Sequence, residues 1–230
     1  MLRFVLLSDL PDAASEKTDH DAETEAALKA TVERLNARYP GAPFHLLHRP
    51  RRFNPGEGVW MGWERKRGKL EQFNAFILTG DATPFSLVAG DVAALRRIRF
   101  VATADADTVL PPGSVARLVG TLAHPLNRAR VEGATGCVTE GYTILQPRVE
   151  IAPEQTTRSA FARLFAGDAA IDIYSRAVSD VYQDLFGEGS FTGKGLYEVA
   201  PFARGLAGRA PENRILSHDL FEGLHGRVAL

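Results

Sequence analysis

The sequence is poor in cysteine, in net charge and in long apolar runs. Its 230 residues include one cysteine, Cys137, which excludes a disulfide framework and a zinc cluster built on several cysteines. The formal net charge is −1, whereas a nucleic-acid-binding domain carries a basic excess, so we expect no nucleic-acid partner. No apolar run is long enough to cross a bilayer, and the start, MLRFVLLSDLPD, is too short for a signal peptide. These absences indicate a soluble globular chain with one large domain or two small ones.

Charge is distributed unevenly along the chain. Residues 9–25 hold seven acids against Lys17, and residues 49–69 hold seven bases against Glu57 and Glu64. Two solvated faces would explain both runs. A basic loop that binds a phosphorylated ligand would explain the second run, and charge alone does not decide between the two interpretations.

Strand-like and helix-like patterns alternate. Short apolar runs predict strands, and apolar residues at helical spacing predict the helices between them. Strands are predicted at Arg3–Leu7, Phe44–Leu47, Arg99–Ala104, 141–151 and Leu196–Val199, and helices at 23–38, from about Arg65, from Pro111-Pro112, near 157–166 and 169–185, and at 218–228. The alternation predicts an α/β fold with a mostly parallel sheet flanked by helices and ligands at the carboxyl ends of its strands.

The strongest local signal is the D-x-D pair Asp105 and Asp107, directly after a predicted buried strand. Two carboxylates at this position suit Mg²⁺ or Mn²⁺ held together with substrate phosphates. Aspartates are also common in turns after strands, because their side chains bond to local backbone. Asp9 and Asp12 follow another strand, so we expect them at the same edge of the sheet, although capping of the next helix would explain at least one of them.

Three further segments are candidates for binding or catalysis. The block 66–69 (KRGK) begins a helix, where backbone amides and cations can bind phosphate, although basic side chains there oppose the helix dipole. Asp219, with His218 before it and Glu222 one turn later, is either a helix cap or a general base. The glycine-rich segment Gly187–Gly195 is either a flexible loop or a place where backbone approaches a sugar closely.

Read in order, these pieces resemble the glycosyltransferase domain of cyclic β-1,2-glucan synthases. The blocks that carry the resemblance are LLSDLPDA, GVWMGWERKRGKLEQFN, TADADTVLPPG, GYTILQPRV, SDVYQDLFGEGSFTGKGLYEV and PENRILSHDLFEGLHGR. A more distant likeness extends to the glucosyltransferases of osmoregulated periplasmic glucans and to cellulose-synthase-like family 2 enzymes. The resemblance implies a GT-A-like, Rossmann-like fold.

The resemblance also implies roles for individual residues. Asp105 and Asp107 match the D-x-D that binds the divalent metal and the UDP diphosphate, and Asp219 matches the catalytic base. Asp9 and Lys66 match positions that bind the nucleotide of the donor. Positions that line the sugar and acceptor pocket are matched by Gly193, Lys194 and Gly195.

The implied reaction is metal-dependent, inverting transfer of glucose from UDP-glucose to a growing β-1,2-glucan acceptor. The family pattern also includes an earlier strand, a later Q-x-x-R-W segment and flanking transmembrane helices. Residues 1–230 are therefore expected to be a partial glycosyltransferase domain, truncated at both ends and inactive alone. Its partners would be the remaining domains and transmembrane helices of a membrane enzyme, at the cytoplasmic face of the bacterial inner membrane.

Two other functions are compatible with these residues. One is a nucleotide-sugar transferase that makes a different linkage, since the acceptor chemistry is not encoded in these motifs. The other is a non-catalytic module that binds a nucleotide or a glucan, in which the acidic residues serve only as caps. Metal-dependent UDP binding would separate the two transferases from the non-catalytic module.

Overall fold

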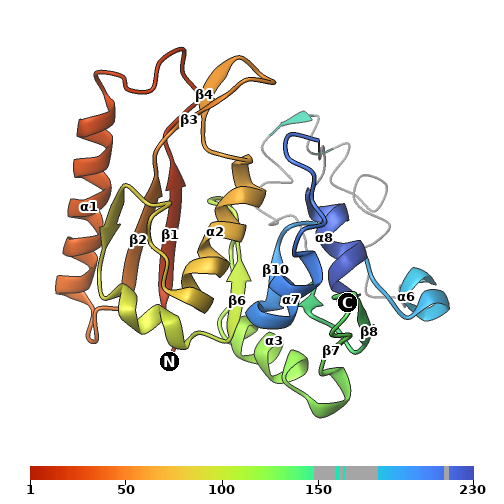
Figure 1. Cartoon of the computed structure of the whole chain (residues 1–230). Coiled ribbons are helices and arrows are strands. Elements are labelled where there is room, and N and C mark those ends of the chain that lie inside the picture. The colour runs from red at the N-terminus through yellow and green to blue at the C-terminus, as the bar shows by residue number, and fades with distance from the viewer. Residues whose placement is uncertain (148–158, 161–162, 164–180, 215–217) are drawn as a thin grey trace. The chain divides into compact units, whose positions relative to one another are not determined.

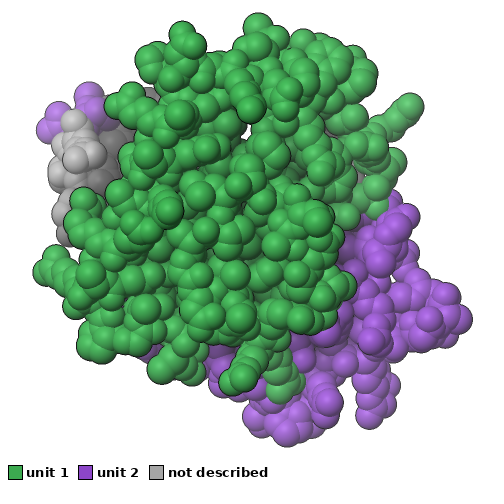
Figure 2. Space-filling view, turned by 60° about the vertical axis from the view of Figure 1, so that its left-hand side comes forward, with its two compact units in different colours: residues 1–99, 210–215 green, residues 100–209, 216–230 purple. Residues whose placement is uncertain are grey.

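The computed structural model describes residues 1–147, 159–160, 163, 181–214 and 218–230. The chain forms two compact units, shown as a ribbon in Figure 1 and coloured separately in Figure 2. Unit 1 comprises residues 1–99 and 210–215, and unit 2 comprises residues 100–209 and 216–230. None of the described helices is both long and apolar enough to cross a membrane. The expectation of one domain over residues 1–230 stays a prediction.

Unit 1 is built on a three-stranded sheet in the order β1-β2-β5. Its strands are β1 (Phe4–Asp9), β2 (Phe44–Arg49) and β5 (Leu87–Ala89). β1 and β2 pair in parallel, whereas β2 and β5 are antiparallel. Helix α1 (Asp21–Arg38) lies against this sheet in Figure 1, and its Val32 is buried with Leu46 and Ala89. This packing removes the apolar stripe of α1 from water and so holds the helix on the sheet.

The remainder of unit 1 positions a basic helix. The hairpin of β3 (Arg52–Asn54) and β4 (Val59–Met61) leads into α2 (Arg65–Thr79), and a 3₁₀ helix, η1, spans Val92–Arg97. The helix predicted from about Arg65 is confirmed as α2, and four large apolar residues at helical spacing on one of its faces are buried: Leu70, Phe73, Phe76 and Ile77. This buried face fixes how α2 presents its basic first turn.

Unit 2 contains a four-stranded sheet in the order β11-β9-β10-β6. Its strands are β6 (Phe100–Thr103), β9 (Ile144–Leu145), β10 (Gly195–Glu198) and β11 (Val228–Ala229). The helices are α3 (Ser114–Leu122), α6 (Val181–Phe186), α7 (Val199–Leu206), α8 (His218–Gly226) and the 3₁₀ helix η2 (Pro125–Asn127), and a hairpin joins β7 (Arg130–Val131) to β8 (Val138–Glu140). Leu122 of α3 is buried with Leu145 and Leu196 in the core of this unit.

The α/β class is confirmed, but the prediction of a mostly parallel sheet is wrong for the described strands. Among them, β1–β2 and β11–β9 are parallel, and the other strand pairs are antiparallel. Alternating strands and helices imply parallel pairing only if each helix returns the chain to the same end of one sheet. Here the antiparallel strand β10 is the neighbour of both β6 and β9, and no local pattern encodes that direction.

Several predicted elements differ in extent. The predicted helix at 157–166 lies almost entirely outside the described residues, as do most of the predicted helix at 169–185 and the end of the predicted strand at 141–151. Helix α6 overlaps the end of the range 169–185. The last helix ends at Gly226, earlier than predicted, and the chain continues into β11. A side chain at position 226 would come within 2.8 Å of Ile144 and 2.9 Å of Thr143, so close packing against β9 explains this glycine.

Two buried histidines in β2 are expected to make unit 1 sensitive to acid. His45 and His48 are 1% and 0% exposed, and burial lowers the pKa of both. Below pH 6.5 both histidines become protonated in the unfolded chain, whereas in the folded chain they stay neutral down to their lowered pKa. The free energy of unfolding therefore falls as the pH falls from 6.5 toward that lowered pKa. The loss is about 1.4 kcal/mol for each unit by which a pKa is lowered.

Urea denaturation at pH 7.5 and pH 5 tests this expectation. Trp60 and Trp63 are the chain's two tryptophans and both lie in unit 1, so their fluorescence follows this unit. The variant His45→Gln should lose stability less steeply on acidification than the wild type, whereas His20→Gln, at an exposed histidine, should not differ from it. Equal pH dependence of His45→Gln and the wild type would contradict the expectation.

Candidate functional site

The loop after β6 carries the two aspartates of the D-x-D pair. Asp105 is partly buried and Asp107 is exposed. The amide of Asp105 donates to Oγ1 of Thr108 at 3.1 Å, and the amide of Thr108 donates to the carbonyl of Asp105 at 3.0 Å. These bonds form a tight turn from main-chain atoms of Asp105. The turn therefore helps to set where the two carboxylates project.

Consecutive residues of the glycine-rich segment contact both the D-x-D loop and α8. Lys194 Nζ lies 3.2 Å from Oδ2 of Asp105. Gly193 has a φ of +76°, and its Cα lies so close to the Asp219 carboxylate that a side chain there would collide with it. Gly195 begins β10, which pairs with β6. Unit 2 thus brings together Asp105, Asp219 and the predicted pocket residues 193–195.

The first two turns of α8 carry a cluster of one histidine and two acids. His218 Nδ1 lies 2.9 Å from Oδ1 of Asp219 and 3.2 Å from Oε2 of Glu222. The Oδ1 atom of Asp219 is buried and has this ion pair, but no hydrogen bond from a described residue. One nitrogen or oxygen from each side chain lies within 4.8 Å of the others. A single positive charge on the imidazole can therefore serve both carboxylates.

The electrostatics of this cluster favour a charged imidazole. Burial alone would lower the pKa of His218, but the adjoining carboxylates of Asp219 and Glu222 outweigh burial and raise it to about 9. His218 is therefore protonated at neutral pH. The cation lies directly beside Asp219, the predicted base.

In unit 1, Asp9 is held in a network of ion pairs. Its Oδ1 accepts a hydrogen bond from Nε of Arg49 at 2.6 Å, and its Oδ2 lies 2.8 Å from Nζ of Lys69. Burial raises the pKa of Asp9, but its hydrogen bonds to Arg49 and Lys69 outweigh this effect and hold the pKa below its usual value. A side chain at Gly62 would come within 2.8 Å of Asp9, so this glycine leaves room for the pair. Asp9 is ionised and fixed beside the start of α2.

Lys66 lies in the first turn of α2 and is partly buried. This turn contains no acid, although acids are favoured at a helix N-terminus. The neighbouring bases instead pair with carboxylates: Arg65 with Asp12 at 3.0 Å, Arg67 with Glu64 at 2.8 Å, and Lys69 with Asp9 at 2.8 Å. A side chain at Gly68 would collide with the carbonyl oxygen of Trp63, which explains the glycine of the K-x-G block. Carboxylates of the chain itself therefore offset the unfavourable charge at this helix start.

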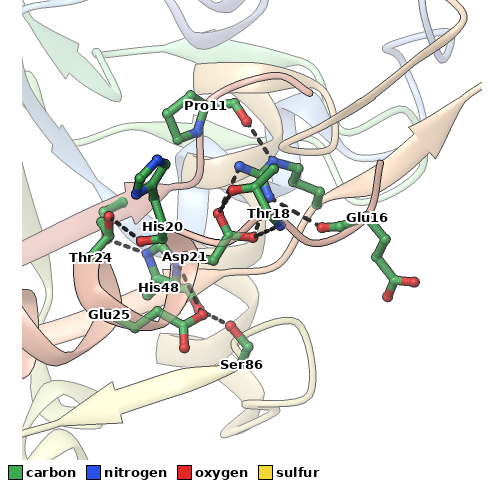
Figure 3. Close-up of polar contacts among 11 residues, drawn as sticks. Pro11, Glu16, Thr18, His20, Asp21, Thr24, Glu25, His48 and Ser86 are labelled. Carbon is green, nitrogen blue, oxygen red and sulfur yellow. Dashed lines mark hydrogen bonds and ion pairs between the residues drawn. The ribbon is translucent and has the colours of Figure 1, made fainter. Parts of the chain in front are cut away.

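The acidic and basic segments pair with each other. Arg51 contacts Asp21 in bidentate fashion, at 2.6 and 3.0 Å, and donates to the carbonyl of Pro11 at 2.5 Å. Figure 3 shows the Asp21 carboxylate beside Thr18, whose amide and hydroxyl also donate to it. Hydrogen bonds from Arg51 and Thr18 lower the pKa of Asp21. Because these pairs are partly buried, the two segments are not simply solvated faces. Phosphate binding by the basic segment stays a prediction.

Asp9 and Asp105 do not share one sheet. Asp9 ends β1 in the three-stranded sheet, whereas Asp105 follows β6 in the four-stranded sheet. The prediction of one common sheet edge for both residues is therefore wrong. It assumed that every strand of the alternating pattern joins a single sheet, and strand partners depend on contacts between distant parts of the chain.

Two residues of these clusters carried no predicted role. Arg49 is 2% exposed and binds Asp9, and Glu222 is 2% exposed and binds His218. A sequence signal for the first was the pair of opposite charges, Asp9 and Arg49, each two residues after a predicted strand; the register of β1 and β2 then places them side by side. A signal for the second was the spacing of His218 and Glu222, which places both on one face of a helix.

Comparison with known proteins shows which proteins the chain is similar to. No protein-family model matches the chain. Over 233 residues, 99% of this chain, it is 48% identical to the Cyclic beta-(1,2)-glucan synthase NdvB of Rhizobium meliloti (strain 1021). The chain is similar to part of a cyclic β-1,2-glucan synthase. The family resemblance predicted from the motifs is thereby confirmed. The chain spans 8% of the length of that synthase.

Proposed function

We propose that the chain is a glycosyltransferase domain that acts in the synthesis of a cyclic β-1,2-glucan. In this proposal it transfers glucose from UDP-glucose to a growing β-1,2-glucan, with inversion at the anomeric carbon. The similarity to the glucan synthase supports the product class. The observation that carries the assignment is the placement of Gly193 against Asp219 and of Lys194 against Asp105. One short segment thereby links the proposed base to the proposed diphosphate site.

Asp219 is the proposed general base. The acceptor hydroxyl attacks the anomeric carbon in line, a new carbon–oxygen bond forms, and UDP leaves with the electron pair of the bond that breaks. Asp219 takes the proton of the attacking hydroxyl. Its carboxylate suits this role because it lies in the first turn of α8 and against the main chain of Gly193, where a sugar can approach without a side chain in the way.

Asp105 and Asp107 are the proposed ligands of Mg²⁺ or Mn²⁺. Carboxylate oxygens are the ligands that these hard cations prefer. The two carboxylates lie on one short loop after β6, and the ammonium group of Lys194, 3.2 Å from Oδ2 of Asp105, would pair with the diphosphate when the metal holds that oxygen. When bound, the metal would neutralise charge that develops on the departing diphosphate. Lys194 supplies positive charge at the same place.

Asp9 and Lys66 are proposed to serve the nucleotide of the donor. Asp9 orients Arg49 and Lys69, and these contacts place the basic first turn of α2 beside the end of β1. Helix N-termini with basic side chains bind phosphate groups. We further propose that the protein carrying this sequence is a membrane enzyme acting at the cytoplasmic face of the bacterial inner membrane, with its other domains and transmembrane helices as partners.

Calorimetric titration of UDP into the chain, with and without Mn²⁺, tests the donor site. We expect binding that needs the metal and is lost in Asp105→Asn/Asp107→Asn, because the two carboxylates would hold the ion. The control is Asp184→Asn at an exposed aspartate of α6, which should bind as the wild type does. Metal-independent binding, or equal binding by the double variant, would contradict the metal assignment. A folded chain without UDP binding would favour the alternative in which these acids serve only as caps.

A further inference from the structure

Glu222 is a buried acid that the proposed reaction leaves without a role. Its side chain is 3% exposed, in the second turn of α8. A buried carboxylate is costly unless it is paired or hydrogen-bonded. Among the described residues, its hydrogen-bond partner is Nδ1 of His218, at 3.2 Å. The two residues are four apart on one helix, so the backbone of α8 sets their spacing.

The same nitrogen of His218 also lies 2.9 Å from Oδ1 of Asp219. One ring nitrogen is thus shared by a buried acid and by the proposed base. The oxygen of Asp219 that faces the ring is buried and receives no hydrogen bond from the described residues. Its orientation therefore depends on the charge of the imidazole, and that charge depends on both carboxylates.

We propose that Glu222 is a positioning residue, which holds the ring of His218 against Asp219 and so keeps the Asp219 carboxylate turned toward Gly193. This inference rests on the proposed function, because it takes Asp219 as the base. Glu222 itself contacts neither the acceptor nor the donor in this proposal. It acts through His218.

The physical reason lies in the balance that sets the charge of His218. Burial disfavours the protonated ring, and among the described residues the carboxylates of Asp219 and Glu222 favour it. Without the charge of Glu222, less opposes the effect of burial, and the ring loses its proton at a lower pH. A neutral ring with its lone pair on Nδ1 repels Oδ1 of Asp219 and no longer fixes that carboxylate.

Titration of the histidines by NMR tests the first half of the proposal in this chain. His218 should titrate near pH 9 in the wild type. In Glu222→Gln, which keeps the shape and removes the charge, we expect its pKa to fall by about one unit or more. His225, on the same helix, is the internal reference, and its own titration should not change in Glu222→Gln. The matched control is Glu140→Gln, at an exposed glutamate, which should leave the titration of His218 unchanged. An unchanged His218 pKa in Glu222→Gln would overturn the proposal.

Kinetics of the natural protein that carries this sequence test the second half. Glu222→Gln should lower kcat about 10- to 100-fold, part of the ~10²–10⁴ that general-base catalysis contributes, with little change in KM for the donor. The alkaline limb of its pH–rate profile should move to lower pH, because His218 loses its proton earlier. Glu222→Asp should restore part of the rate. Wild-type kcat in Glu222→Gln, with Asp219→Asn inactive, would overturn the positioning role alone, whereas activity in Asp219→Asn would overturn the proposed function.

Discussion

Asp219→Asn is expected to abolish glucosyl transfer while the fold and UDP binding persist. The amide has the size of the carboxylate but cannot accept the proton of the attacking hydroxyl, so the rate should fall by about 10²–10⁴-fold. Transfer is measured as release of UDP and as growth of the glucan in the natural protein that carries this sequence. Binding of UDP is measured by calorimetry on the chain itself. A loss of kcat with unchanged UDP binding would support Asp219 as the base.

The matched control for this substitution is Asp184→Asn. Asp184 is exposed on α6 and has no role in the proposed mechanism, so the same chemical change should leave transfer unchanged. Retained transfer by Asp219→Asn would refute the base assignment. Loss of transfer in both variants would show that the assay responds to changes of surface charge rather than to the loss of a base.

Gly193→Ala is expected to stop transfer by displacing Asp219. Gly193 has a φ of +76°, and a methyl group on its Cα would collide with both oxygens of the Asp219 carboxylate. The left-handed backbone costs a non-glycine residue about 1–2 kcal/mol. The collision adds a further cost, typically ~1–3 kcal/mol for an overpacked site. The carboxylate must move away, so kcat should fall while metal-dependent UDP binding through Asp105 and Asp107 remains.

Gly187→Ala separates the effect of the collision from that of the backbone. Gly187 has a φ of +69°, similar to that of Gly193, but a methyl group there would meet no atom within 4 Å. Both variants should therefore lose similar stability from backbone strain, and Gly193→Ala alone should lose transfer. Thermal unfolding followed by circular dichroism gives the stability comparison. Equal activity of the two variants would argue against close approach of Gly193 and Asp219 in the working enzyme.

The helices with a clear apolar stripe were predictable from sequence. The inward residues of α2 form a regular pattern of large apolar side chains, and Val32 of α1 and Leu122 of α3, which also lie at helical spacing from other apolar residues, are buried. Strands without such a pattern escaped prediction, β11 among them. It has two residues, pairs with β9, and follows Gly226, which ends α8 in close contact with Thr143 and Ile144. A local pattern that short holds too little information to define a strand.

The candidate site could be predicted only in pieces. Asp105, Lys194 and Asp219 each belong to a motif that the sequence singles out, but the contacts of Lys194 with Asp105 and of Gly193 with Asp219 join segments far apart in the chain. The spacing of His218 and Glu222 places them on one face of a helix, but the burial of Glu222 could not be predicted, because a glutamate one turn along a helix is usually solvated. Its burial depends on what packs over α8, which no local pattern contains.

The sequence by itself determined the α/β class, the buried faces of the main helices and the family resemblance, because apolar spacing and motif order are properties of the linear chain. Only the tertiary structure decided the direction of β10, the assignment of Asp9 and Asp105 to different sheets, and the pairing of the acidic segment with the basic one. The physical reason is the same in each case. Hydrogen bonds between strands and ion pairs such as Asp9–Arg49 form between residues distant in sequence, and their free energy depends on the burial that the whole fold creates.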